Sequence, residues 1–176
     1  MTGSTTRASL TGPGGVAILL RRMFPFIALV PQVDPQGRFA AVWGTIEGVA
    51  YNFISVYVPP QTHVSTLGAL GEALLRLPQG VTVIGGDCNA LMDRAKDSSR
   101  GVGGKFQAAD VRIKACVASL GLCDIWRIWN PSLTQFTHTS AAHGTHSRLY
   151  DLLMPSTDVQ LTRESSILTK GISDHS

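Results

Sequence analysis

The residues best suited to chemistry are Asp87 and Asn89 in the run Gly85-Gly86-Asp87-Cys88-Asn89, which follows a short apolar segment at 81–84. Residues two apart in extended backbone point to the same side, so this carboxylate and carboxamide would act together. Such a pair can hold an attacking water and a phosphate oxygen near a metal ion. The two glycines would let a substrate or a neighbouring backbone come close. A turn in which Asp87 and Asn89 bond local backbone groups explains the motif equally well.

Three further segments carry weaker signals. The run Ser173-Asp174-His175-Ser176 places a histidine beside an acid, which can protonate or stabilise a phosphorane-like transition state. A surface turn is the more common origin of such a pair. Tyr57 would either place a hydroxyl near a strand end or be a half-buried strand aromatic. Asp151 opens an apolar run, from which it could orient a histidine on a neighbouring strand.

Basic residues follow the Asp87 motif in a polar, Gly-rich stretch at 91–105, which we expect to be a loop. They could track phosphates, although a solvated basic loop is the equal alternative: Arg94, Lys96, Arg100 and Lys105. A net charge of +3 is compatible with a polyanionic partner without requiring one. The histidines at 138, 143 and 146 have no cysteine or acid at ligand spacing, which argues against zinc.

The composition indicates one globular domain, because 44% of the 176 residues are hydrophobic and only 15% are charged. Three cysteines make an odd count without a CxxC motif, which favours free thiols in a reducing compartment. The longest apolar stretch, at 15–30, is broken by two arginines and a proline and is too short to cross a bilayer. The N-terminus lacks the apolar core of a signal peptide. We therefore expect an intracellular protein without a membrane partner.

Periodicity predicts the elements that must position these groups. Short apolar runs between turn signals predict strands at 16–20, 26–30, 38–44, 51–58, 81–84, 149–154 and 159–161. Apolar residues at helical spacing predict helices at 63–77, stopped by Pro78, and at about 106–120. Hairpins followed by alternating helices and strands favour mixed sheets with helices packed outside.

Taken in order, these segments resemble the endonuclease/exonuclease/phosphatase superfamily, which includes abasic-site endonucleases, pancreatic deoxyribonuclease and LINE-type retrotransposon endonuclease domains. The matching motifs are Gly14-Gly15-Val16-Ala17, Tyr57-Val58-Pro59, Gly86-Asp87-Cys88-Asn89, Ser147-Arg148-Leu149 and Ser173-Asp174-His175. Asp124-Ile125-Trp126-Arg127 and the ending Gly171-Ile172-Ser173-Asp174-His175-Ser176 are similar to the retrotransposon branch. The resemblance implies an α/β fold with two packed mixed β-sheets flanked by helices, a four-layer sandwich like that of pancreatic deoxyribonuclease. We expect this fold to be incomplete at both ends, with 1–13 as a disordered lead-in and 14–176 as the truncated domain.

The resemblance also implies a role for each motif residue. Asp87 would orient or deprotonate the attacking water, Asn89 would hold the scissile phosphate and Tyr57 would contact it. His175 would stabilise the pentacovalent transition state, and Asp174 would bind Mg²⁺ (or Mn²⁺) together with Asp87. The implied reaction is metal-assisted phosphodiester hydrolysis that nicks DNA. The DNA contacts would come from Arg94, Lys96, Arg100, Lys105 and Arg148.

Three departures from the family pattern affect the function. Tyr150 stands where the family has an acid, and a one-residue slip would be needed to bring Asp151 to that position. Nothing before Gly14 resembles the family's Asn strand or its Glu metal ligand, and the chain stops soon after His175. We therefore expect impaired catalysis in an endonuclease domain that belongs with a reverse transcriptase and works in the nucleus when functional. The alternatives are a non-catalytic retroelement remnant or another phosphoesterase of the superfamily, such as a lipid phosphatase or an exonuclease.

Overall fold

The computed structural model describes residues 8–9, 15–20, 24–101, 108–140 and 142–168. Its main feature is a mixed six-stranded sheet in the order β3-β4-β5-β6-β10-β7, in which β5 and β6 are parallel and the other neighbours antiparallel. The six strands are β3 (Phe26–Val33), β4 (Phe39–Ile46), β5 (Val49–Tyr57), β6 (Val81–Asp87), β7 (Leu122–Asp124) and β10 (Tyr150–Pro155). Two-stranded pairs are formed by β1 (Ala8–Ser9) with β2 (Ala17–Ile18) and by β8 (His138–Ser140) with β9 (Thr145–Ser147).

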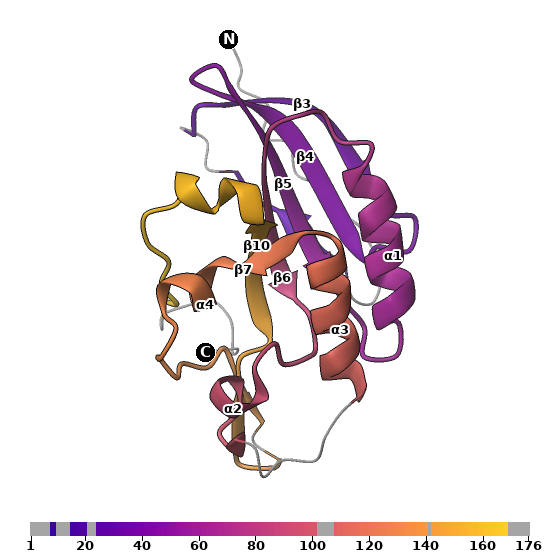
Figure 1. Cartoon of the computed structure of the whole chain (residues 1–176). Helices are drawn as coiled ribbons and strands as arrows, with labels where there is room; N and C mark the ends of the chain where they lie inside the picture. Colours follow the sequence, from indigo (N-terminus) through magenta and orange to yellow (C-terminus); the bar gives the residue numbers. More distant parts are fainter. Residues whose placement is uncertain (1–7, 10–14, 21–23, 102–107, 141, 169–176) are drawn as a thin grey trace.

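Helices cover one face of the large sheet (Figure 1). The two long ones are α1 (His63–Leu74) and α3 (Ala108–Ser119), which also contact each other. Shorter helices lie beside β7 and β10 or in the loops: α2 (Arg94–Asp97), α4 (Ile125–Trp129) and the 3₁₀ turn Ser156–Leu161. The main core lies between this face and the helices, where Ile84, Leu70 and Ile113 are at most 1% exposed. None of the helices in the described ranges has the length and apolar character needed to span a membrane.

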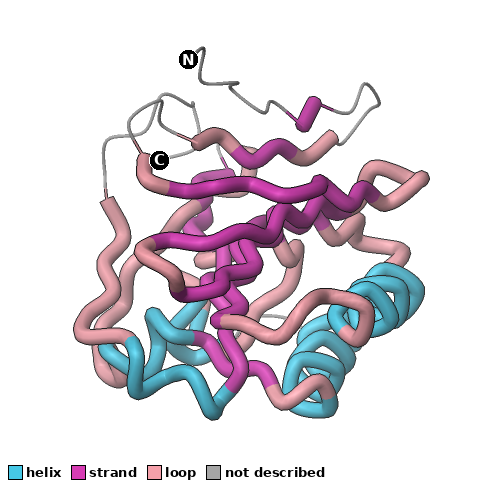
Figure 2. Tube along the Cα trace, turned by 90° about the horizontal axis from the view of Figure 1, so that it is seen from above, coloured by secondary structure: helices cyan, strands magenta, loops and turns pink. Residues whose placement is uncertain are grey.

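The opposite face of the sheet carries only thin cover in the described residues. Figure 2 shows the helices on one side of the sheet and the β1–β2 pair on the other. Strand β2 lies over β4 and β5, and Val42 on β4 is 5% exposed. Beyond β2, the loop toward β3 leaves an apolar pocket of about 500 Å³ over β5, β6 and β10. We call this side of the sheet the open face.

Along the strands, successive side chains alternate between the two faces of the sheet. On β5, Tyr51, Phe53, Ser55 and Tyr57 are half-buried on the open face, whereas the intervening residues are buried against the helices. The hairpin between β4 and β5 turns through Glu47 and Gly48, whose φ angles are 51° and 82°. Two positive φ values are the geometry of a type I′ turn, which matches the twist of the flanking strands.

The predicted α/β class, with mixed sheets and helices packed outside, is confirmed. Within the expected lead-in, Ala8–Ser9 forms β1, and the other residues of 1–13 lie outside the described ranges. One prediction is wrong, because residues 159–161 belong to a 3₁₀ turn rather than a strand. The predicted loop at 91–105 contains the short helix α2.

Candidate active site

The candidate site forms where β5, β6 and β10 meet at one end of the open face. The register pairs Asp87 on β6 with Tyr57 on β5 and with Tyr150 on β10. Paired residues on neighbouring strands lie about 5 Å apart and project to the same face. Tyr57, Asp87 and Tyr150 therefore form a row across the sheet with the carboxylate in the middle. We call these three residues the Asp87 row.

Gly86 allows the backbones of β5 and β6 to lie close together behind the Asp87 row. A Cβ at position 86 would lie 1.8 Å from the Val56 carbonyl oxygen, whereas one at Gly85 would meet the Leu152 side chain at an ordinary 3.8 Å. Only glycine fits at position 86 without moving β5 away from β6. The close approach that the sequence predicted at these glycines is therefore made at Gly86 by the neighbouring backbone of β5.

Asn89 is held beside the row by a tight turn. Its backbone N–H donates to Asp87 Oδ1 at 2.9 Å, and its φ of 48° lies in the left-handed region. Its side-chain Nδ2 donates to the Val58 carbonyl oxygen at 3.1 Å. An amide nitrogen carries two hydrogens, so this bond uses only one of them. The local turn, one of the two readings that the motif left open, is therefore present, and the functional pairing of Asp87 with Asn89 stays a prediction.

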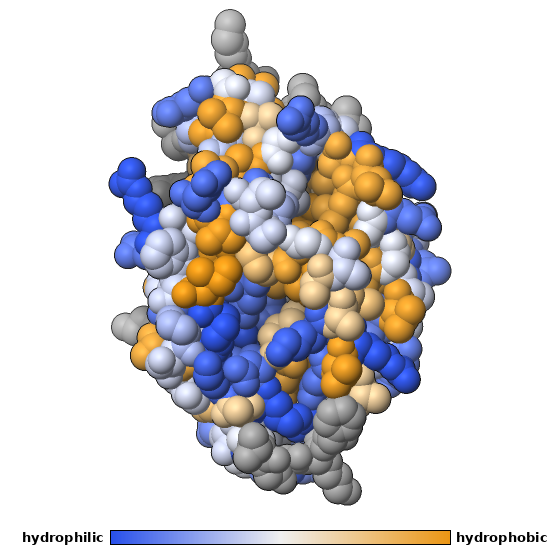
Figure 3. Space-filling model, in the orientation of Figure 1, coloured by the Kyte–Doolittle hydropathy of each residue, from blue (hydrophilic) through white to orange (hydrophobic). Residues whose placement is uncertain are grey.

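A polar pocket of about 310 Å³ adjoins Asn89. Two of the predicted DNA-binding residues, Arg94 and Arg100, line it together with Ser98, Ser147 and His143. Arg94 also donates to Asp110 from Nε at 3.0 Å, which fixes its guanidinium at the pocket wall. Figure 3 shows hydrophilic side chains gathered over the lower part of the molecule, where Figure 1 places α2.

The other predicted cations lie elsewhere. Lys96 donates to the Pro131 carbonyl oxygen at 2.7 Å, away from the pocket. Lys105 lies outside the described residues, as do the predicted site residues Asp174 and His175.

Arg148 corrects a sequence-based prediction, because it is buried rather than available to DNA. Its side chain is fully buried and donates to Asp97 Oδ1 at 2.8 Å, to Asp97 Oδ2 at 3.0 Å, to Asp124 Oδ2 at 2.6 Å and to Asp151 Oδ1 at 2.8 Å. Arg127 adds a bond to Asp97 Oδ1 at 2.5 Å. We call these five residues the ionic hub. Bonds to buried carboxylates occupy the guanidinium of Arg148, so it cannot reach a phosphate.

Asp151 belongs to the hub and not to the Asp87 row. The β6–β10 register runs without a shift from Tyr150↔Asp87 to Leu153↔Ile84, so the one-residue slip is absent. Asp151 is therefore on the helix-covered face, 5% exposed, and Tyr150 takes the position beside Asp87. The prediction that Asp151 would act in the catalytic site is corrected accordingly, since a one-residue offset reverses the face.

The ionic hub shifts the pKa values of acidic groups inside it and beside it. Burial, together with the nearby Asp124 and Asp97 carboxylates, raises the pKa of Asp151 to about 8 against the attraction of Arg148. Its Oδ2 is buried and has no hydrogen-bond partner among the described residues. Two guanidinium groups face three carboxyl groups in the hub, so a proton held on Asp151 balances the charge. Burial likewise raises the pKa of the Cys88 thiol, which lies beside Asp151, so Cys88 stays protonated.

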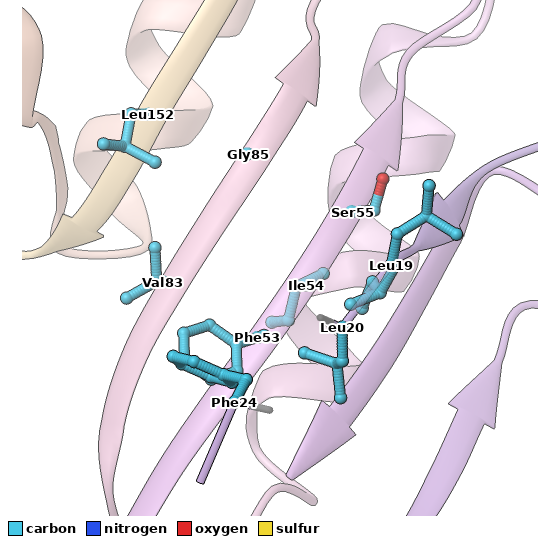
Figure 4. Close-up of a pocket in the computed structure, with 10 residues that line it drawn as sticks. Leu19, Leu20, Phe24, Phe53, Ile54, Ser55, Val83, Gly85 and Leu152 are labelled. Carbon is cyan, nitrogen blue, oxygen red and sulfur yellow. The ribbon is translucent and has the colours of Figure 1, made fainter. Parts of the chain in front are cut away.

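The apolar pocket of the open face ends next to the Asp87 row. Figure 4 shows Leu19, Leu20 and Phe24 grouped over β5, with Val83 on β6 and Leu152 on β10 beside them. The Phe53 ring packs edge-on to Phe26 at 5.3 Å and parallel to Tyr51 at 5.8 Å. Ser55, Gly85 and Leu152 line the pocket, and each is two residues from a member of the row.

The described side chains offer one carboxylate for a metal ion at the row, that of Asp87. No group of three or more His, Cys, Asp or Glu side chains among the described residues is arranged to hold a metal. Mg²⁺ in proteins uses one or two carboxylates and fills the remaining positions with water and phosphate oxygens. Asp87 therefore fits as a single ligand in such a site.

Sequence comparison finds a partial relative. No family model matches the chain. An uncharacterized 149 kDa protein of transposon TX1 from Xenopus laevis is 28% identical over 169 residues, which cover 92% of this chain and 12% of that protein. The chain thus spans only a small part of this curated relative.

Solved structures share the fold. The 3'-5' exonuclease NExo from Neisseria meningitidis matches with a TM-score of 0.60 at 17% identity, over 79% of this chain and 63% of that one. The endonuclease domain of TRAS1, a telomere-specific non-LTR retrotransposon, matches with a TM-score of 0.53 at 16% identity, over 75% of this chain and 56% of that one. The chain therefore has the fold of the endonuclease/exonuclease/phosphatase superfamily, to which these structural neighbours belong.

Proposed function

We propose that the chain is a nuclease domain of a retroelement that hydrolyses DNA phosphodiester bonds with the help of Mg²⁺ or Mn²⁺. The observation that carries the proposal is the Asp87 row at the sheet end, with Asn89 and a polar pocket lined by Arg94, Arg100 and Asp110 directly beside it. The sequence likeness to a transposon protein supports the retroelement context. A reverse transcriptase on the same polypeptide and action in the nucleus are parts of this proposal.

In this proposal each side chain has its own role in the hydrolysis. Asp87 holds and deprotonates the attacking water. Asn89 donates its second amide hydrogen to a phosphate oxygen, and Tyr57 donates its hydroxyl to the same group. A divalent ion on Asp87 would supply neutralisation of the charge that develops on the phosphate. His175 and Asp174 would complete the site from the C-terminal segment.

Catalysis by this chain should be weak, since Asp87 is the one carboxylate that the described residues bring to the row. Tyr150 occupies the neighbouring position where an acid could fix a histidine, and a phenol does not favour a charged imidazole as a carboxylate does. This substitution also favours the second candidate function, a non-catalytic remnant that keeps affinity for nucleic acid.

Plasmid relaxation in Mg²⁺ tests the proposal. We expect slow nicking that EDTA and Asp87→Ala abolish. Asp151→Asn, a change on the opposite face, should retain nicking at a temperature at which it stays folded. Absence of nicking at high protein concentration would refute the catalytic proposal and leave the remnant. Fast nicking that requires Asp87 would refute the expected impairment.

A further inference from the structure

The 162–168 segment follows the 3₁₀ turn and has no regular secondary structure. Figure 1 shows its course, in yellow, past α4. Side chains hold it by hydrogen bonds at three points along its length: Trp129 Nε1 donates to Thr162 Oγ1 at 2.8 Å, Asn130 Nδ2 to the Ser165 carbonyl oxygen at 2.8 Å and Gln135 Nε2 to the Ile167 carbonyl oxygen at 3.2 Å. Every donor belongs to the end of α4 or to the loop that follows it. The segment is therefore fixed by side chains of one stretch and not by strand pairing.

Asn130 joins this segment directly to helix α4. Its Nδ2 donates to the Trp126 carbonyl oxygen at 2.9 Å as well as to the Ser165 carbonyl oxygen. An amide nitrogen carries two hydrogens, so the two bonds use both of them. Helix α4 starts with the buried residues Ile125 and Trp126 and is therefore anchored in the body of the domain. Asn130 thus transfers the fixed position of α4 to the 162–168 segment.

A short series of contacts joins the end of this segment to the Asp87 row. Leu168 lines a pocket of about 280 Å³ together with Phe136 and His146, whose rings stack with their centroids 5.8 Å apart. The next residue, Thr137, is buried, and its Oγ1 accepts the backbone N–H of Tyr150 at 3.2 Å. Tyr150 is a member of the Asp87 row. The 162–168 segment therefore ends beside the residues that support the start of β10.

The two residues expected to complete the row follow the segment closely in sequence. Asp174 and His175 come six and seven residues after Leu168. Seven residues of extended chain span at most about 25 Å. A fixed starting point at Leu168 keeps both residues within this reach and lowers the entropy cost of bringing them to one site. The hydrogen bonds to the 162–168 segment therefore bear on the geometry of the row.

We propose that Trp129, Asn130 and Gln135 are positioning residues, which hold the 162–168 segment so that the residues after Leu168 bring Asp174 and His175 to the Asp87 row. The three side chains touch neither substrate nor metal in this proposal. The use of Asp174 and His175 in hydrolysis rests on the proposed function, whereas the anchoring of the segment and its approach to the row do not.

Gln135→Glu breaks the anchor with almost no change in side-chain shape. It puts a carboxylate oxygen in place of the amide donor, opposite the Ile167 carbonyl oxygen. The half-buried position of Gln135 tolerates such a change without unfolding the domain. The matched control is Gln79→Glu, the same charge change at an exposed residue before β6, at the end of that strand opposite to Asp87.

Limited trypsin digestion of the full chain measures the anchoring through cleavage after the exposed Arg163. We expect cleavage about fivefold faster in Gln135→Glu than in Gln79→Glu, because the loss of one hydrogen bond raises the population of the detached segment. Trp129→Phe, which removes only the Nε1–H donor to Thr162, should act in the same direction. Cleavage rates of both variants equal to that of the control would overturn the anchoring.

A nitroxide label tests the approach to the row without any need for activity. The label is attached at Ser176→Cys in a background with serine at the half-buried Cys116 and Cys123, and backbone amide signals are followed by NMR. We expect the label to broaden the signals of the Asp87 row, and this broadening to be lost in Gln135→Glu but kept in Gln79→Glu. Row signals that stay sharp in the labelled background would overturn the positioning role.

Hydrolysis of bis(p-nitrophenyl) phosphate in Mg²⁺ measures the consequence for catalysis. Gln135→Glu should lower kcat several-fold with KM unchanged, because the positioned residues act in the transition state. In a His175→Ala background the same change should have no further effect. An equal loss in that background would show that Gln135 acts through stability and would overturn the proposal. If the wild type does not hydrolyse this substrate, the nuclease proposal fails, and the trypsin and nitroxide results still decide the anchoring and the approach.

Discussion

Replacing Arg148 with Met should destabilise the protein far more than a typical loss of one charged side chain. Arg148 is fully buried, and its four hydrogen bonds join Asp97, Asp124 and Asp151 from three separate segments of the chain. Methionine fills similar space but leaves these carboxylates together in the interior with only Arg127 to offset them.

The magnitude follows from the uncompensated charge. Three bonds to carboxylates at about 1.5–3 kcal/mol each and one to the protonated Asp151 at about 0.5–1.5 kcal/mol would sum to roughly 5–10 kcal/mol, but the desolvation of the guanidinium is recovered when the arginine is removed. Breaking a buried ion pair from one side typically costs about 3–5 kcal/mol. We expect a loss of about 4 kcal/mol, a large part of the roughly 5–15 kcal/mol that stabilises a domain.

Urea unfolding followed by circular dichroism measures this loss through the midpoint and the m-value. The matched control is Arg76→Met, because Arg76 forms an exposed pair with Glu72 at 3.7 Å whose loss should cost under about 1 kcal/mol. Adding Asp124→Asn to Arg148→Met should recover part of the stability, because Asp124 then has no ion-pair partner, whereas Asp97 keeps its pair with Arg127. A loss below about 1 kcal/mol for Arg148→Met would refute the assignment of the hub as a buried charge cluster.

Three further predictions concern the site and its support. Because the pKa of Asp151 is raised to about 8, the folded state keeps a proton that the unfolded state releases near pH 4. The free energy of unfolding should therefore fall as the pH rises from 4 to 8. Asp151→Asn should flatten this slope. Gly86→Ala should unfold or distort the β5–β6 pairing, whereas Gly85→Ala should be tolerated; equal thermal stability of the two would contradict the close approach. Tyr150→Phe and Tyr57→Phe should each lower DNA nicking or binding, and the matched change Tyr51→Phe, on the same face but away from the row, should not. An effect of Tyr51→Phe as large as the others would show that the hydroxyls act through folding.

The sequence predicted the helices and strands that are long enough to show a hydrophobic period. Alternation along β5 and the apolar run into Gly85-Gly86-Asp87 located the central strands and the candidate Asp87 site. Three-residue elements such as β7 and β8 are too short to show a period, so they were missed. The roles of Arg148 and Asp151 were mispredicted because residue type suggested function. The β6–β10 register decides which face Asp151 meets, and the surrounding carboxylates bind the guanidinium of Arg148. Tyr150 could have been identified as the neighbour of Asp87 by counting the unshifted alternation back from Leu152.

The order of strands in the sheet has a consequence for folding. Strands β3 to β6 are neighbours in sequence and in space, so they can assemble through short-range contacts. Strand β10 pairs with β6 across a long stretch of sequence, so closing this pairing carries a larger loop-closure entropy cost than the β3–β4 and β4–β5 hairpins. Its arrival brings Tyr150 to Asp87 and Arg148 to the waiting carboxylates in one step. A nascent chain that lacks this strand therefore has neither the finished sheet nor the finished row of three side chains.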